Sequence, residues 1–132
     1  MPIGTGCAQP NDVLLLTRPI GAGVILAGHM AGDAPGRVVA EALRVMATPQ
    51  AREAEILARA HAMTDVTGFG LAGHVQAICR ASGVAAELWA DAVPLYSGAQ
   101  ALSDQGVASS LLPVNQADAP ISAAGSVSPL LH

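Results

Sequence analysis

The residues with the clearest chemical potential lie between Met63 and His74, in the stretch MTDVTGFGLAGH. It places one carboxylate, Asp65, ahead of three glycines, where we expect a short strand to end and a helix to begin. A carboxylate oxygen is a suitable ligand for a hard cation such as Mg²⁺. Glycines let the backbone approach a ligand closely, and the free N–H groups at a helix start attract anions. The pattern therefore indicates a metal-bound phosphate beside Asp65.

Each residue of this stretch also has an interpretation that needs no ligand. Aspartate commonly caps helices and organises turns, so Asp65 alone does not establish a metal site. The hydroxyls of Thr64 and Thr67 can donate to phosphate or simply suit strand and turn geometry. The glycines from Gly68 and Gly70 onward are spaced G-x-G-x-x-G, but this is a weak dinucleotide signal without a convincing βαβ unit.

Few other residues carry chemistry. His74 near the helix start can face a ligand, although a hydrogen-bonded structural histidine is the better-supported interpretation. Arg18 can point at a phosphate or lie on the surface, and Asn115 can make a polar contact or occupy a plain turn. Cys7 has no neighbouring His or Lys that would activate it as a nucleophile. No histidine has a partner at zinc-ligand spacing.

Composition excludes several classes of function. The chain has 132 residues and a formal charge of −4, and its six basic residues are scattered arginines, which argues against nucleic acid or an anionic membrane as partner. Because lysine is absent, no lysine-dependent mechanism can be completed within this chain. Residues 19–32 are too few and too rich in glycine for a membrane span. Two distant cysteines and no apolar leader predict a cytoplasmic protein.

Alternating hydrophobic patterns predict an α/β or α+β fold with a mixed sheet packed by helices. We expect a linker remnant at residues 1–11 and an incomplete α/β domain at 12–132, with irregular chain at 115–128 and the start of another strand at 129–132. The expected strands are 12–17, 62–66 and 84–89, and the expected helices are 24–30, 35–46, 48–60, 70–81 and 97–103.

Three segments resemble the selenophosphate synthetases, also called selenide, water dikinases. Residues 12–24, DVLLLTRPIGAGV, resemble the family's GD-x-LILTKPLGTGV segment, and residues 63–74 resemble its TDVTGFGL-x-GH signature. Short matches between residues 81 and 99 follow in the family's order. Aminoimidazole ribonucleotide synthetase, thiamine-phosphate kinase and hydrogenase maturation proteins have related folds but other versions of the aspartate turn, so the TDVTGFG string is fairly specific. The resemblance covers roughly residues 10–115.

The resemblance implies a homodimeric enzyme of the aminoimidazole ribonucleotide synthetase-like superfamily. Such an enzyme makes selenophosphate from selenide, ATP and water, uses Mg²⁺, and releases AMP and phosphate. Its product supplies selenium for selenocysteine and selenouridine. The family's TDVTGFG aspartate is a metal ligand, and Asp65 occupies that position here. Thr64, Thr67, Gly68 and Gly70 would then lie near the phosphates.

The chain departs from the family pattern in several places. The family's reactive Cys or selenocysteine, its partner Lys and most of its metal-binding aspartates belong to an N-terminal domain that this chain does not contain. Cys7 has no Lys three residues on, so we assign no catalytic residue here. Arg18 stands where the family usually has Lys, which keeps the charge but changes the donor geometry. The expectation is a C-terminal domain truncated at both ends and inactive alone.

Two alternatives remain open at this point. One is another ATP-using enzyme of the same superfamily, such as a small-molecule kinase or a cyclo-ligase. The other is an inactive fragment that acts only as a binding or oligomerisation module. Binding of Mg-ATP would separate the second from the first, because a ligand that binds only the folded state stabilises it.

Overall fold

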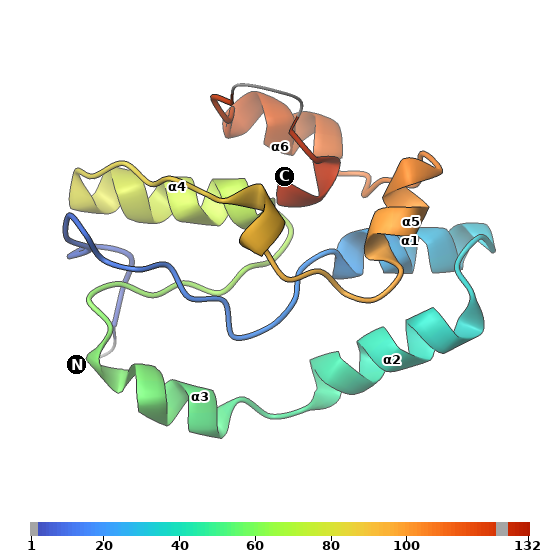
Figure 1. Cartoon of the computed structure of the whole chain (residues 1–132), viewed down its shortest axis with the longest axis horizontal. Coiled ribbons are helices and arrows are strands. Elements are labelled where there is room, and N and C mark those ends of the chain that lie inside the picture. Colours follow the sequence, from blue (N-terminus) through green and yellow to red (C-terminus); the bar gives the residue numbers. More distant parts are fainter. Residues whose placement is uncertain (1–2, 124–126) are drawn as a thin grey trace.

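The computed structural model describes residues 3–123 and 127–132, where helices are joined by long irregular segments (Figure 1). In this part of the chain, no helix is long and apolar enough to cross a membrane. The helices are α1 (Ala22–Ala31), α2 (Gly36–Ala47), α3 (Ala51–Ile56), α4 (Gly70–Ser82), α5 (Ala99–Asp104) and α6 (Leu112–Asp118), with 3-10 turns η1 (Leu57–Arg59), η2 (Ala90–Ala92) and η3 (Pro129–Leu131).

Local sequence signals account for where the helices begin and end. α1 stops at Gly32, which adopts a left-handed backbone with φ 83° and donates its N–H to the carbonyls of Gly28 and His29. α2 begins directly after Pro35, whose fixed φ suits a helix start. The predicted helices at 24–30, 35–46, 70–81 and 97–103 are confirmed as α1, α2, α4 and α5. The one predicted at 48–60 is confirmed as α3 followed by η1.

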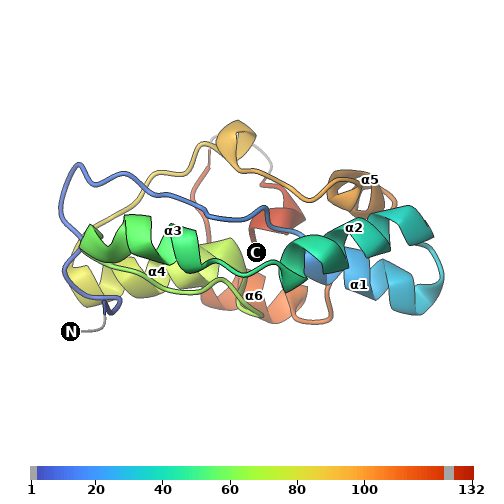
Figure 2. The ribbon, with the colours of Figure 1, turned by 90° about the horizontal axis from the view of Figure 1, so that it is seen from below.

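The core consists of two adjoining apolar clusters. In the first, α1, α2 and α5 pack together at one end of the molecule (Figure 1). The second surrounds Ile20, Leu71 on α4 and Leu131 on η3. η3 contacts both α4 and α5, so it joins the two clusters, and both views place the C-terminal residue near the middle of the molecule (Figures 1 and 2). Burying these side chains supplies most of the stability that positions α4.

The predicted mixed sheet is not confirmed. The stretches 12–17, 62–66 and 84–89 run as irregular chain, and the described residues contain only one isolated parallel bridge, between Ile20 and Leu95. A strand needs a neighbour that shares its backbone hydrogen bonds along its length. A hydrophobic run predicts that a stretch is buried, but it does not show which other stretch, if any, would pair with it as a neighbouring strand.

The first of these stretches shows the consequence of the missing neighbour. Val13 and Leu15 keep 79% and 68% of their surface exposed, although a continuous apolar run predicts a strand covered on both faces. The bridge beyond it is closed by two 2.9 Å hydrogen bonds, from the Ile20 N–H to the Pro94 carbonyl and from the Tyr96 N–H to the Ile20 carbonyl. These two bonds fix the entry to α1 against the segment before α5.

Two predictions for the C-terminal quarter are corrected, one of them only in part, because the expected irregular chain is found at 119–123 and 127–128 but not at 115–118. Residues 115–118 belong to α6, which begins with Pro113 in its first turn, where proline fits a helix well. Residues 129–131 form the 3-10 turn η3 instead of a strand, and Ser128 caps it by accepting the Leu130 N–H. Irregular chain was also expected over 124–126, which lie outside the described residues.

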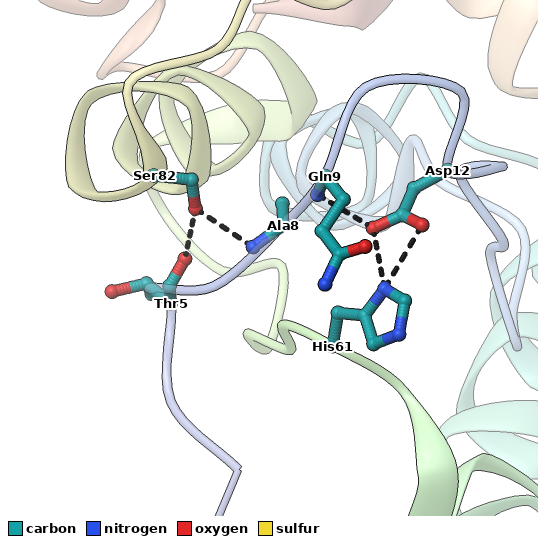
Figure 3. Close-up of polar contacts among 6 residues, drawn as sticks. All are labelled: Thr5, Ala8, Gln9, Asp12, His61 and Ser82. Carbon is teal, nitrogen blue, oxygen red and sulfur yellow. Dashed lines mark hydrogen bonds and ion pairs between the residues drawn. The ribbon is translucent and has the colours of Figure 1, made fainter.

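The N-terminal segment is fastened to the helices by side chains (Figure 3). Ser82, the last residue of α4, accepts the Ala8 N–H at 3.0 Å and donates to the Thr5 carbonyl at 3.2 Å. The Asp12 carboxylate accepts from the Gln9 N–H at 2.8 Å and from Nδ1 of His61 at 2.9 Å. The hydrogen bond from the Gln9 N–H and, to a smaller extent, the one from His61 stabilise the charged carboxylate of Asp12. They lower the pKa of Asp12 below its ordinary value of 3.8. The described part of this predicted linker thus packs on the helical body.

Candidate functional site

The predicted metal ligand lies on the irregular segment that leads into α4. Asp65 is exposed, and within the described residues its carboxylate takes part in no hydrogen bond or ion pair. It therefore neither caps α4 nor closes an Asx turn, which were the two interpretations without a ligand. An exposed, unpartnered carboxylate keeps its oxygens available for a cation.

His74 contacts the residues on both sides of Asp65, through the Thr64 hydroxyl and through the backbone and hydroxyl of Thr67. The Thr67 N–H donates to Nε2 of His74 at 3.0 Å, and the Thr67 hydroxyl lies 3.2 Å from the same nitrogen. The Thr64 hydroxyl lies 3.4 Å from Nδ1 and donates to the Asp65 carbonyl at 3.2 Å. The interpretation of His74 as a hydrogen-bonded structural histidine is confirmed, since the ring is buried with these contacts.

Asn115 of α6 holds the next part of the turn. Its side-chain amide donates to the Gly68 carbonyl at 2.8 Å and to the His132 carbonyl at 2.6 Å. Asn115 is only 5% exposed, so both amide protons are used inside the protein. Of the two interpretations that the sequence left open for Asn115, the polar contact is the one observed.

Gly70 occupies a position that only glycine fits. Its φ is 69°, a left-handed conformation that costs other residues about 1 kcal/mol or more. The backbone carbonyl of His132 lies directly against the Gly70 Cα, so a side chain there would collide with it. Gly68 is less crowded, because an added Cβ would approach only Leu111 Cδ1, at 3.0 Å. The two glycines thus allow α6 and the C-terminal turn to approach the start of α4.

A pocket of about 340 Å³ opens beside this turn, between α4 and α6. Its walls include Phe69, His74, Arg80, Asn115 and Asp118, and Asp65 is not among them. Asp65 is exposed and does not line this pocket, so a ligand bound by its carboxylate would lie outside the pocket.

A magnesium ion would need partners beyond these residues. In residues 3–123 and 127–132, no three His, Cys, Asp or Glu side chains gather closely enough to share a metal ion. Mg²⁺ commonly uses one or two carboxylates together with phosphate oxygens and water. The described residues therefore fit an ion held jointly by Asp65 and nucleotide phosphates. They do not fit an ion held by this chain's side chains alone.

Arg18 has a role that sequence reasoning missed. Its guanidinium donates to the carbonyls of Val45 at 2.6 Å and Thr48 at 2.9 Å, at the C-terminal end of α2. The Val45 carbonyl also accepts the Thr48 N–H at 3.2 Å, and Thr48 is the residue that follows α2, so Arg18 adds a further donor to the carbonyls at this helix end. The positive charge also complements the negative end of the helix dipole. The positive charge of Arg18 was the one signal in the sequence, because Val45 lies 27 positions further along the chain and no local pattern connects the two residues.

Comparison with known proteins places the chain in a family. Residues 9–114 match the family described as AIR synthase related protein, C-terminal domain. This match supports the predicted superfamily, while the mixed sheet that was predicted with it is not found in the described residues.

Several curated proteins similar to this chain are named selenide, water dikinase. The protein of Geobacter metallireducens is 43% identical over 102 residues, which are 76% of this chain and 30% of that protein. The protein of Trichlorobacter lovleyi is 40% identical over 108 residues, and that of Caldanaerobacter subterraneus subsp. tengcongensis is 37% identical over 107. The chain spans about 30% of the length of these relatives. The similarity to selenide, water dikinases is thereby confirmed, and the chain belongs to the AIR synthase related protein, C-terminal domain, family.

Proposed function

We propose that this chain serves in an ATP-dependent selenophosphate synthetase, which converts selenide, ATP and water to selenophosphate, AMP and phosphate. The observation that carries the proposal is the exposed, unpartnered carboxylate of Asp65 on a turn held from both sides. The names of the relatives support selenide and ATP as substrates over those of a small-molecule kinase or a cyclo-ligase.

In this proposal, Asp65 contributes one oxygen ligand to Mg²⁺ on the nucleotide. The ion would neutralise charge on the phosphates, and phosphoryl transfer depends largely on such positioning and charge stabilisation. Gly68 is exposed and would offer its backbone to the phosphates, while Gly70, whose Cβ position is taken by the His132 carbonyl, would act by shaping the turn beside them. Thr67 is an exposed residue, and its hydroxyl would exchange its contact with His74 for a phosphate oxygen, while the Thr64 hydroxyl donates to the Asp65 carbonyl.

No catalytic residue is assigned within this chain, so the catalytic side chains and further metal ligands would come from other parts of the enzyme, while selenide and water are the phosphoryl acceptors. The chain by itself is expected to be inactive: an assay with selenide and Mg-ATP should show no AMP release. Selenide-dependent AMP release from the isolated chain would contradict this division of roles. Homodimer formation and a cytoplasmic location belong to the same proposal.

The metal role of Asp65 is tested by NMR on the isotope-labelled chain with ATP and Mn²⁺, a paramagnetic substitute for Mg²⁺. The amide signals of residues 64–70 should broaden first. Asp65→Asn keeps the shape but removes the charge and should abolish this broadening. Asp91→Asn, the same change at an exposed position on η2, should leave it intact. Equal broadening in wild type and Asp65→Asn, or none around residue 65, would refute the proposal.

A further inference from the structure

His74 and Asn115 are the polar side chains buried in the described part of the chain, and both bind the turn that carries Asp65. A buried polar group is costly unless it is hydrogen-bonded. His74 bonds the Thr67 N–H and contacts the Thr64 hydroxyl, while Asn115 donates to the carbonyls of Gly68 and His132. Of the two, His74 reaches both sides of Asp65, through Thr64 and Thr67. The conformation of the segment around Asp65 therefore depends on this imidazole.

The contacts also determine which ring nitrogen carries the proton. A backbone N–H can only donate, so Nε2 of His74 must accept from Thr67 and must itself be unprotonated. Nδ1 then carries the proton and faces the Thr64 hydroxyl, which in turn donates to the Asp65 carbonyl. The ring of Phe69 lies tilted over the imidazole, with centroids 5.9 Å apart. A continuous chain of hydrogen bonds thus runs from the Thr67 N–H through the ring to the Asp65 carbonyl.

The geometry assigns His74 as the positioning residue of the metal-binding turn: as the Nδ1–H tautomer, it holds the Thr64 hydroxyl and the Thr67 N–H so that the Asp65 carboxylate is presented for a nucleotide-bound cation. This inference rests on the proposed function for its ligand. His74 does not touch the ion. Its effect is to hold the turn in the binding conformation before the ion arrives. Metal binding then costs less conformational entropy, because the turn is already ordered.

The tautomer is tested directly on the ¹⁵N-labelled chain by long-range ¹H–¹⁵N NMR of the imidazoles. The His74 signals are identified by their loss in His74→Gln. We expect the ring proton on Nδ1, with Nε2 accepting the Thr67 N–H. A ring protonated on Nε2, or on both nitrogens, cannot accept the Thr67 N–H and would overturn the assignment.

The positioning role is tested with a pair of variants. His74→Gln keeps an oxygen that can accept the Thr67 N–H and an amide that can donate, while His74→Phe keeps a ring without either group. His74→Phe should speed hydrogen exchange at the Thr67 amide about tenfold, as expected for losing one hydrogen bond of about 1.4 kcal/mol. It should weaken Mn²⁺-ATP binding by a similar factor. His74→Gln should keep the Thr67 exchange rate and the Mn²⁺-ATP affinity close to those of the wild type. His29→Gln, at an exposed position on α1, should change neither the exchange rate nor the affinity.

The outcomes distinguish this inference from the proposed function. If the tautomer and the Thr67 exchange behave as expected but Mn²⁺-ATP does not bind near Asp65, the proposed function fails, and with it the metal part of the His74 role. If Mn²⁺-ATP binds through Asp65 while His74→Phe and His74→Gln bind equally well, the positioning role fails and the proposed function stands. Global stability of each variant, from chemical unfolding, separates a local effect from general unfolding.

Discussion

Asn115 offers the sharpest test of how the candidate site is held. Asn115→Asp changes one NH₂ group to an oxygen and preserves the shape of the side chain. The two protons now donated to the carbonyls of Gly68 and His132 disappear, and a carboxylate faces both oxygens. Asn115→Ala removes the same two donors without adding a charge.

The magnitude follows from these contacts. Each lost hydrogen bond costs about 0.5–1.5 kcal/mol net, so Asn115→Ala should lower the free energy of unfolding by about 1–3 kcal/mol. Asn115→Asp should cost more, about 3–5 kcal/mol, because it also buries a charge without a partner at a site that is 5% exposed. Lowering the pH should recover part of this loss, since a protonated carboxyl can donate one hydrogen bond again.

Chemical unfolding followed by circular dichroism measures these changes, with Gln116→Glu as the matched control. Gln116 is the next residue on α6 and is exposed, so the same amide-to-carboxylate change should cost little there. Hydrogen exchange should also show faster opening of the turn around Gly68 in Asn115→Asp. If Asn115→Asp is no more destabilising than Gln116→Glu, the buried amide does not hold the turn.

Two further predictions concern groups outside the turn. Arg18→Lys should lower the free energy of unfolding, measured by chemical denaturation, by about 1 kcal/mol. One ammonium group cannot span the carbonyls of Val45 and Thr48 as the guanidinium does. Arg52→Lys, at an exposed site on α3, is the control. Burial lowers the pKa of His132 below its ordinary value of 6.5, so the folded state favours the neutral ring and stability should fall as the pH drops below 6.5. His132→Gln should flatten this pH dependence, and an unchanged slope would contradict it.

The helices could be predicted because their signals are local. Gly32 and Gly83 end α1 and α4 within one residue of the last helical position, and Pro35 precedes α2. Periodic apolar residues mark the faces that become buried, such as Leu71 and Val75 on α4. Information of this kind spans only a few residues, which is the range that helix formation requires.

The bridge found in the described residues and the supports of the candidate site could not be predicted, because they depend on distant parts of the chain. The bridge joins Ile20 to Leu95, and the Asn115 amide reaches a carbonyl 47 residues away. No spacing rule connects such pairs. By contrast, the His74 contact with Thr67 spans only seven residues within the TDVTGFGLAGH stretch. The sequence therefore contained a signal for the role of His74, namely a histidine one helical turn after a glycine bend.

The distribution of buried polar groups argues that the shape of the Asp65 turn is specifically maintained. A plain connection between α3 and α4 could leave its backbone to water at little cost. Here the two buried polar side chains of the described residues both bind that backbone, while the one carboxylate of the turn stays exposed and unpartnered. Buried hydrogen-bonded groups fix a unique conformation, and a fixed carboxylate is what a metal-bound phosphate requires. The supports of the turn and the free state of Asp65 are therefore two parts of one arrangement.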